Sequence, residues 1–207
     1  MNLQKSLDEL KAELTNYSKH SAEYHDRMVH SIPDAEVIDR QKFILTECID
    51  KTVLDIGCKG DLHSDIKLIA KRVYGIDHAE VKDDPDFFKV ELTKEEIPLL
   101  EGIEVIICGE VLEHLSNPGL FLEELKKKYP NKKKIFSVPN AFGIFHTTWI
   151  RKGEENVNND HVAYYSWKTF TTLVKRYGYE VSGFYWYDNP NQIQKQGFNE
   201  GLVFVTT

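Results

Sequence analysis

From residue 50 onward the chain alternates between short apolar runs and helical patterns, and this alternation limits its fold more than any other feature. The runs are rich in β-branched residues and almost wholly apolar, which is typical of parallel strands covered on both faces. Strands that alternate with helices form an open α/β sheet within one domain. The expected strands are Val53–Ile56, Val73–Ile76, Phe87–Val90, Val105–Cys108, Ile135–Val138, Val181–Tyr187 and Leu202–Val205.

The helices between these strands carry recognisable start and stop signals. Asn117 can cap a helix that begins at Pro118, because its side chain accepts from a free backbone N–H and proline suits the first helical position. Ser166 is the expected cap of a later helix, and Gly178 lies just past the end of that helix. Residues 37–49 are also expected to be helical.

The first 36 residues indicate a separate helical extension or lid before the main domain, which we expect over 37–207. The pattern suits packing on the chain's own domain or a dimer arm, so we expect a monomer or a homodimer. Leucines at helical spacing form one apolar stripe along the extension: Leu3, Leu7, Leu10 and Leu14.

Composition and charge exclude several classes of protein. No apolar run in the 207 residues approaches the roughly 20 that a membrane span needs, and the start lacks the features of a secretory signal, so we expect no membrane partner. The net charge of −7 repels nucleic acid over the whole molecule. The cysteines Cys48, Cys58 and Cys108 are odd in number and lie in apolar surroundings. They are expected to be reduced core residues of a cytoplasmic protein.

The strand ends are the place to look for a site, because ligands of open α/β sheets bind at the carboxyl ends of the strands. The first strand has Asp55 near its end. Gly57 directly follows this strand, and there the backbone can turn tightly and approach a ligand. Twenty residues later the second strand ends in Asp77, and a carboxylate there can accept hydrogen bonds from both hydroxyls of a ribose. This pairing predicts a nucleoside cofactor and favours a site role for Asp55 over a simple strand-end cap.

The fourth strand and the segment after it, Val105–Pro118, closely resemble the fourth-strand motif of class I S-adenosylmethionine-dependent methyltransferases. Leu54–Cys58 resembles the first motif of that superfamily, and Ser137–Asn140 its fifth strand end. Within the superfamily the chain looks closest to the ubiquinone-biosynthesis O-methyltransferases, whose arginine and aromatic–isoleucine arrangement Arg40–Ile44 matches.

This resemblance implies a Rossmann-like, open twisted sheet of seven mostly parallel strands, flanked by helices and with the last strand antiparallel. It also implies S-adenosylmethionine as cofactor and S-adenosylhomocysteine as product. The glycine loop departs from the usual Gly-x-Gly-x-Gly, because Lys59 and Asp61 replace the second and third glycines and can reshape the loop. The implied cofactor contacts are Arg40, Asp55, Gly57, Cys58, Lys59, Asp77, His78, Glu91, Leu92, Gly109 and Glu110.

A metal is a separate question raised by Glu110, Glu113 and His114, whose spacing places them on one face of a helix. Small-RNA 2′-O-methyltransferases bind a metal through a similar Glu-x-x-Glu-His and a distant histidine, for which His161 is the candidate. Because the same pattern occurs in metal-free relatives, we expect a hydrogen-bonded helix start and no metal.

The acceptor is expected at residues 139–165, the longest irregular stretch, because long loops in compact domains are usually functional. A hydroxyl acceptor must lose a proton, for which a histidine is the usual base. His161 is favoured because Asp160 can orient it, with His114 and His146 as alternatives. Aromatic residues that can form the acceptor wall are Phe145, Trp149, Tyr164 and Tyr165.

The favoured function is therefore methyl transfer to a small-molecule acceptor, at oxygen. Two alternatives stay open: a metal-assisted RNA 2′-O-methyltransferase, and a non-catalytic protein of the same fold that binds the cofactor. A nicotinamide dehydrogenase lacks support because the Gly-x-Gly-x-x-Gly motif is missing. The basic run 126–134 could bind phosphate, but a solvated helix end is the favoured interpretation.

Overall fold

A computed structural model describes residues 9, 12, 29–80, 84–188 and 197–207 of the chain. Residues 34–207 form one compact unit. The expected extension over 1–36 and its leucine stripe fall almost entirely outside the described residues and stay a prediction. None of the described helices has the length and apolar character needed to span a membrane.

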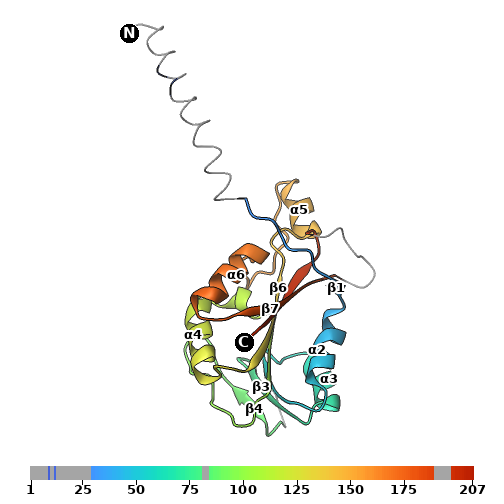
Figure 1. Cartoon of the computed structure of the whole chain (residues 1–207), viewed down its shortest axis with the longest axis vertical. Coiled ribbons are helices and arrows are strands. Elements are labelled where there is room, and N and C mark those ends of the chain that lie inside the picture. Colours follow the sequence, from blue (N-terminus) through green and yellow to red (C-terminus); the bar gives the residue numbers. More distant parts are fainter. Residues whose placement is uncertain (1–8, 10–11, 13–28, 81–83, 189–196) are drawn as a thin grey trace. The chain divides into compact units, whose positions relative to one another are not determined.

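A single sheet of eight strands runs through the unit, in the order β1-β7-β8-β6-β5-β2-β3-β4 (Figure 1). All neighbouring strands are parallel except β8, which is antiparallel to both β6 and β7. The expected Rossmann-like sheet with an antiparallel last strand is confirmed. The strands are β1 Val37–Ile38, β2 Thr52–Ile56, β3 Arg72–Asp77, β4 Phe87–Lys89, β5 Val105–Gly109, β6 Lys133–Pro139, β7 Val181–Tyr187 and β8 Gly201–Thr206.

The sheet has one strand more than expected, because the prediction of a helix from residue 37 is wrong at its start. Val37 and Ile38 instead pair in parallel with Trp186 and Tyr187 at the edge of the sheet. Their β-branched side chains suit an extended backbone. Asp39 then ends the strand and caps the helix, accepting a hydrogen bond from the backbone N–H of residue 42 at 3.0 Å.

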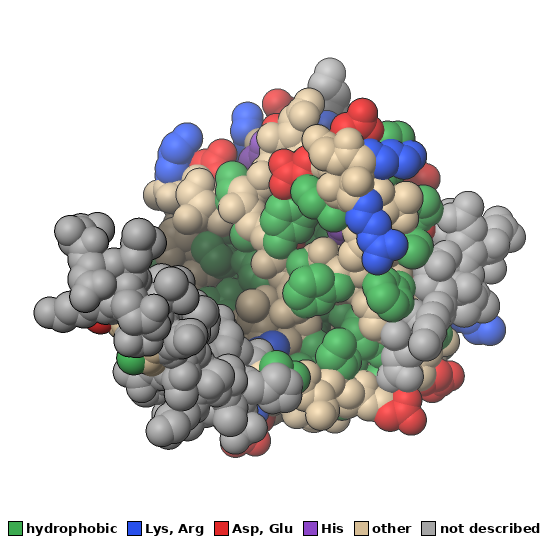
Figure 2. Space-filling model, turned by 90° about the horizontal axis from the view of Figure 1, so that it is seen from above, with side chains coloured by type: hydrophobic (Ala, Val, Ile, Leu, Met, Phe, Trp, Pro, Cys, Tyr) green, Lys and Arg blue, Asp and Glu red, His purple; other side chains and the backbone are tan. Residues whose placement is uncertain are grey.

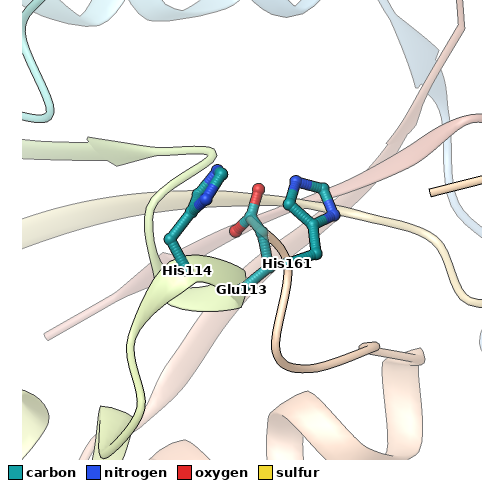
Figure 3. Close-up of side chains that lie close together, drawn as sticks. All are labelled: Glu113, His114 and His161. Atoms are coloured by element: carbon teal, nitrogen blue, oxygen red, sulfur yellow. The ribbon is translucent and has the colours of Figure 1, made fainter. Parts of the chain in front are cut away.

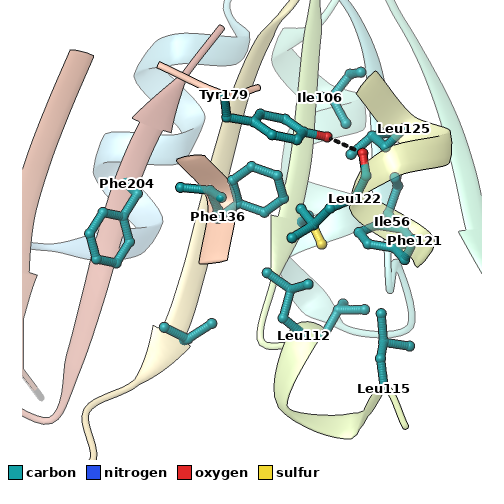
Figure 4. Close-up of a cluster of buried hydrophobic side chains, with 14 of the residues drawn as sticks. Ile56, Ile106, Leu112, Leu115, Phe121, Leu122, Leu125, Phe136, Tyr179 and Phe204 are labelled. Carbon is teal, nitrogen blue, oxygen red and sulfur yellow. Dashed lines mark hydrogen bonds between the residues drawn. The ribbon is translucent and has the colours of Figure 1, made fainter. Parts of the chain in front are cut away.

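Helices cover both faces of the sheet and enclose two cores (Figure 1). Helices α2 (Arg40–Cys48) and α3 (Asp61–Ile69) bury their apolar side chains on one face. Helices α4 (Pro118–Lys128) and α6 (Trp167–Arg176) do so on the other, where the larger core lies (Figure 4). The only polar link drawn in that core is the Tyr179 hydroxyl, which donates to the carbonyl of Leu122 at 2.8 Å.

The helix signals of the sequence are confirmed at both expected caps. The side chain of Asn117 accepts from the backbone N–H of Leu120 at 3.3 Å, and Pro118 is the first residue of α4. Ser166 and Thr169 form a reciprocal capping box at the start of α6. Gly178 has a φ of +77°, a left-handed conformation that glycine adopts without strain after a helix. Cys48, Cys58 and Cys108 are free and buried, as expected.

The stretch 139–165 is less irregular than the sequence indicates, because it contains the short helix α5 (Ile144–Ile150). Asn140, buried at the end of β6, anchors this stretch: its side-chain amide donates to the carbonyls of Gly197 and Asn199 at 3.1 and 2.9 Å. The backbone N–H of Val162 donates to the carbonyl of Glu113 at 2.8 Å and so ties the far end of the stretch to the 3₁₀-helix η1 (Leu112–His114).

Candidate functional site

Two cavities of about 440 and 330 Å³ lie at the carboxyl ends of the parallel strands, where the sequence analysis expects a ligand. Gly57, Lys59 and Glu110 line both cavities, so the two are adjacent. Each of the eleven residues expected at the cofactor lines one or both of them. The larger cavity contains Asp77, His78, Glu91 and Leu92, and the smaller one contains Arg40, Asp55, Cys58 and Gly109.

The turn after β2 needs a glycine at position 57. Gly57 has a φ of +79°, and a side chain there would place its Cβ 2.4 Å from Cγ2 of Val111. The next loop residues are held by Asp77, whose carboxylate accepts from the backbone N–H groups of Lys59 and Ala79 at 3.1 and 2.9 Å. The acid that the sequence analysis assigns to a ribose therefore also fixes the shape of the loop that contains Lys59.

Asp55 belongs to a buried network that sequence reasoning missed. Its Oδ2 lies 2.8 Å from Nδ1 of His63, and Nε2 of His63 lies 3.6 Å from the carboxylate of Asp84, which is also paired with Lys67. Burial raises the pKa of Asp55, and the hydrogen bond from His63 opposes that rise. A Cβ at position 75 would lie 3.0 Å from the His63 ring, so Gly75 makes room for it.

The smaller cavity has a cation and an anion side by side. The guanidinium of Arg40 lies 3.6 Å from the carboxylate of Glu110 and donates to the hydroxyl of Ser137 at 3.1 Å. Glu110 also accepts from the hydroxyl of Tyr187 at 2.8 Å. Tyr187 was not among the expected site residues, because it lies at the end of the sixth expected strand without any motif around it.

Glu113, His114 and His161 converge on one point (Figure 3). Their ligand atoms lie within 4.8 Å of one another, and the two imidazole rings meet edge to face at 4.6 Å. Glu113 is 1% exposed, and neither of its carboxylate oxygens has a hydrogen-bond partner among the described residues. Burial and the nearby charge of Glu110 raise the pKa of Glu113 to about 8. Because His114 and Asp160 line the larger cavity, this triad of side chains borders it.

Glu110 does not join this triad, contrary to the spacing argument. The sequence predicts one helical face over 110–114, but only Leu112–His114 is helical, and Glu110 has a φ of +56°. Its side chain therefore turns toward Arg40 and Tyr187 instead.

The surroundings of His161 keep its ring available as a proton acceptor. Burial, together with the neighbouring imidazoles of His114 and His146, lowers the pKa of His161. At neutral pH its ring is therefore uncharged, and a neutral imidazole can accept a proton or bind a cation. The other two histidines that the sequence analysis offers as bases, His114 and His146, both lie within electrostatic reach of His161.

The expected acceptor wall divides into exposed and buried parts. Phe145, Trp149 and Tyr164 are each about 40% exposed on α5 and the following loop, and Tyr164 packs edge to face on His146. Figure 2 looks onto the end of the molecule where α5 lies and shows hydrophobic side chains gathered around a hollow. Tyr165 differs from the expectation, because it is buried and donates to the carbonyl of Leu112. It supports the wall from below and does not line it.

The basic run 126–134 is engaged within the domain. Four of the six lysines there donate to backbone carbonyls or pair with acidic side chains, which leaves less charge for a phosphate. Lys134 is fully buried, and burial lowers its pKa to about 8. The engaged lysines are Lys126, Lys128, Lys133 and Lys134.

Comparisons with known proteins agree with this arrangement. The sequence model of a family described as "Methyltransferase domain" matches residues 13–182, which is most of the chain. The chain belongs to this methyltransferase domain family. No curated protein matches it.

Solved structures with the same fold include methyltransferases of more than one kind. A small RNA methyltransferase HEN1 has a TM-score of 0.64 at 16% identity over 86% of this chain, which spans only 26% of that protein. An S-adenosylmethionine-dependent methyltransferase from Mesorhizobium loti has a TM-score of 0.57 at 14% identity, with 81% of this chain and 95% of that one covered. The methyltransferase domain of a bacterial Hen1 has a TM-score of 0.58 at 21% identity, with 81% and 96% covered.

Family and fold together confirm the expected class: the chain is a methyltransferase with the fold of the S-adenosylmethionine-dependent enzymes.

Proposed function

We propose that this methyltransferase transfers the methyl group of S-adenosylmethionine to an oxygen atom of a hydroxyl-bearing acceptor. The observation that carries this proposal is the position of the uncharged His161, beside His114 and Glu113, at the border of the larger cavity. A proton acceptor at the edge of a cofactor cavity is what an alcohol or phenol needs and an already nucleophilic amine does not.

The two cavities suit the two halves of the cofactor. Asp77 and His78 would contact the ribose and adenine in the larger cavity, beside Glu91 and Leu92. In the smaller cavity the charges of Arg40 and Glu110 would face the carboxylate and ammonium groups of the amino-acid end. The cofactor supplies an activated methyl group on a positively charged sulfur, which leaves as the neutral thioether of S-adenosylhomocysteine.

The residues of the chain then align the acceptor, exclude water and move one proton. The acceptor oxygen forms its bond to the methyl carbon as the carbon–sulfur bond breaks, and its proton passes to His161. The exposed rings of Phe145, Trp149 and Tyr164 provide an apolar surface beside this point, which favours a small acceptor with an apolar body. The likeness of Arg40–Ile44 to the ubiquinone-biosynthesis enzymes supports the same choice.

A methyl-transfer assay with labelled cofactor tests the proposal. The full-length chain is incubated with S-adenosylmethionine that carries an isotopic methyl group and with phenols, sugars and nucleosides in turn. We expect label on the oxygen of at least one hydroxyl compound, and strong loss of that transfer in His161→Ala. Label found only on nitrogen or carbon, or undiminished transfer in the variant, would contradict an oxygen acceptor with His161 as base.

A metal-assisted RNA 2′-O-methyltransferase is the second candidate, and the triad Glu113, His114 and His161 is the observation that favours it. A carboxylate without hydrogen bonds beside two imidazoles is a donor set that suits a divalent transition metal. The likeness to the fold of the small RNA methyltransferase HEN1 points the same way, whereas the net charge of −7 points against RNA.

Elemental analysis separates the two candidates. The expectation of no metal predicts less than about 0.1 divalent ion per chain after purification and dialysis, and transfer to small hydroxyl compounds that a chelator does not slow. About one ion per chain, with transfer to the 2′-hydroxyl of an RNA end that stops with a chelator, would establish the second candidate instead.

A further inference from the structure

The end of β7 brings a tyrosine to the amino-acid side of the proposed cofactor site. Because β1 and β7 pair in parallel with Ile38 opposite Tyr187, Arg40 at the start of α2 follows only two residues beyond Tyr187's partner. The guanidinium carbon of Arg40 accordingly lies 5.4 Å from the centre of the Tyr187 ring. The pairing of the edge strand β1 with β7 thus places this ring beside the cation of the smaller cavity.

The Tyr187 ring has one defined position, because it packs directly against the backbone of β8 at Gly201. Gly201 is its pairing partner there, and a Cβ on Gly201 would lie 2.0 Å from Cζ of Tyr187 and 2.2 Å from its hydroxyl oxygen. Only glycine leaves the ring this space. Burial also raises the pKa of Tyr187 well above its usual value, so the hydroxyl keeps its proton and acts as a donor.

The acceptor of that hydrogen bond is Glu110, whose backbone conformation is unusual. Glu110 lies just after β5 with a φ of +56°, a region that side-chain-bearing residues seldom adopt. Its Oε1 accepts from the Tyr187 hydroxyl at 2.8 Å and lies 3.6 Å from Arg40. Its other oxygen accepts no hydrogen bond from the part of the chain that the structure describes, and Glu110 lines both cavities.

We infer that Tyr187 is a positioning residue, which holds the carboxylate of Glu110 beside Arg40 so that the pair can bind the ammonium and carboxylate groups at the amino-acid end of the cofactor. Without this hydrogen bond the Glu110 side chain could swing away from Arg40, because its backbone conformation alone does not fix its direction. The inference rests on the proposed function, since it assumes that the cofactor occupies the two cavities.

Two ligands that differ only in the amino-acid end provide the test. S-adenosylhomocysteine carries this end, whereas 5′-methylthioadenosine lacks it and keeps the adenosine. In calorimetric titrations of the full chain, Tyr187→Phe should weaken S-adenosylhomocysteine binding about 5- to 30-fold, since it removes a hydrogen bond to a charged group. Its affinity for 5′-methylthioadenosine should stay within about twofold of wild type, because the contacts to the adenosine are untouched.

Tyr179→Phe is the matched control, because it removes a buried phenol hydroxyl with the same 2.8 Å donor distance, away from both cavities. It should lower the melting temperature and leave both affinities unchanged. Gly201→Ala forces the Tyr187 ring to move and should reproduce the selective loss of S-adenosylhomocysteine.

Equal weakening of both ligands in Tyr187→Phe, or no weakening of either, would overturn the positioning role while leaving the proposed function intact. A wild-type chain that binds neither ligand would overturn the proposed function itself, and the inference with it.

Discussion

Glu113 is the residue whose surroundings differ most from those of an ordinary carboxylate. It is enclosed beside two imidazoles, without a hydrogen bond from the described residues, and its pKa lies near 8. A group in that state either holds a proton at neutral pH or receives a cation. Two variants, Glu113→Gln and His161→Ala, probe this residue and its neighbour.

The stability of the metal-free chain should fall as pH rises through the range in which Glu113 loses its proton. The folded pKa of about 8 lies above the ordinary value of 4.5, so the folded state binds this proton more tightly than the unfolded state. Its stabilising effect is complete below about pH 4.5 and is lost as pH rises through 8. Between pH 5 and 8 the free energy of unfolding should drop by about 2 kcal/mol or more relative to Glu113→Gln.

Urea unfolding at several pH values, with chelator present, measures this difference. Parallel curves for wild type and Glu113→Gln would show that the carboxylate is not perturbed. A divalent cation that bound the triad would oppose the trend, and it would stabilise the wild type more at pH 8 than at pH 5.

His161→Ala should separate catalysis from cofactor binding. Turnover should fall about 10²- to 10⁴-fold if His161 takes the acceptor's proton, while S-adenosylhomocysteine affinity stays nearly unchanged. Because the pKa of His161 is lowered from 6.5, the wild-type rate should be level around pH 7–8 and fall only on the acid side of 6.5. Added imidazole should restore part of the lost rate. A variant that loses cofactor affinity as strongly as turnover would place His161 in the cofactor site instead.

At the scale of elements, the loop between β2 and α3 depends on groups that no motif announces. The sequence motif covers Asp55, which lies within the strand, and Gly57, which directly follows it. The partners His63 and Asp84 lie on a helix and on a later loop, and they meet Asp55 only because the parallel pairing of β2 and β3 brings these elements together. A single sequence contains no signal for such a contact.

His63→Ala should therefore destabilise the fold and loosen the cofactor loop together. It leaves the buried carboxylate of Asp55 without its partner, which we expect to cost about 2–4 kcal/mol. Denaturant unfolding measures this loss. Arg72→Ala breaks the exposed ion pair with Asp86 and serves as control, with a much smaller expected loss. Equal losses in both variants would mean that the network does not stabilise the loop.

The other elements show where sequence patterns succeed and fail. The seven expected strands and both capped helices appear with ends within two residues, because apolar runs and caps are local signals. Val37–Ile38 was assigned to a helix because a two-residue edge strand is defined only by its distant partner. Helix α5 has no buried residue, so it leaves no apolar periodicity to detect. The direction of the Glu110 side chain goes with a positive φ and with a hydrogen bond from the distant Tyr187, neither of which composition and spacing encode.

At the scale of the whole molecule, the order of the sheet assembles the site. The cofactor residues come from the ends of β2, β3, β4 and β5, which follow one another in the sheet as β5-β2-β3-β4, together with Arg40 from the start of α2. The acceptor surface comes from the stretch after β6, on the other side of β5. The sequence could predict this division, because strand ends in a parallel sheet share one edge. It could not predict that the rings of His114 and His161 meet there, with His146 close enough to act on His161.

Calorimetric titration of the purified chain with S-adenosylhomocysteine tests most directly whether the two cavities together hold the cofactor. We predict saturable binding of about one ligand per chain, weakened by about 1.5–3 kcal/mol in Asp77→Ala because the ribose hydroxyls lose their acceptor. Tyr179→Phe should bind as the wild type does. No binding by the wild type at millimolar ligand, or full affinity in Asp77→Ala, would contradict this assignment of the site.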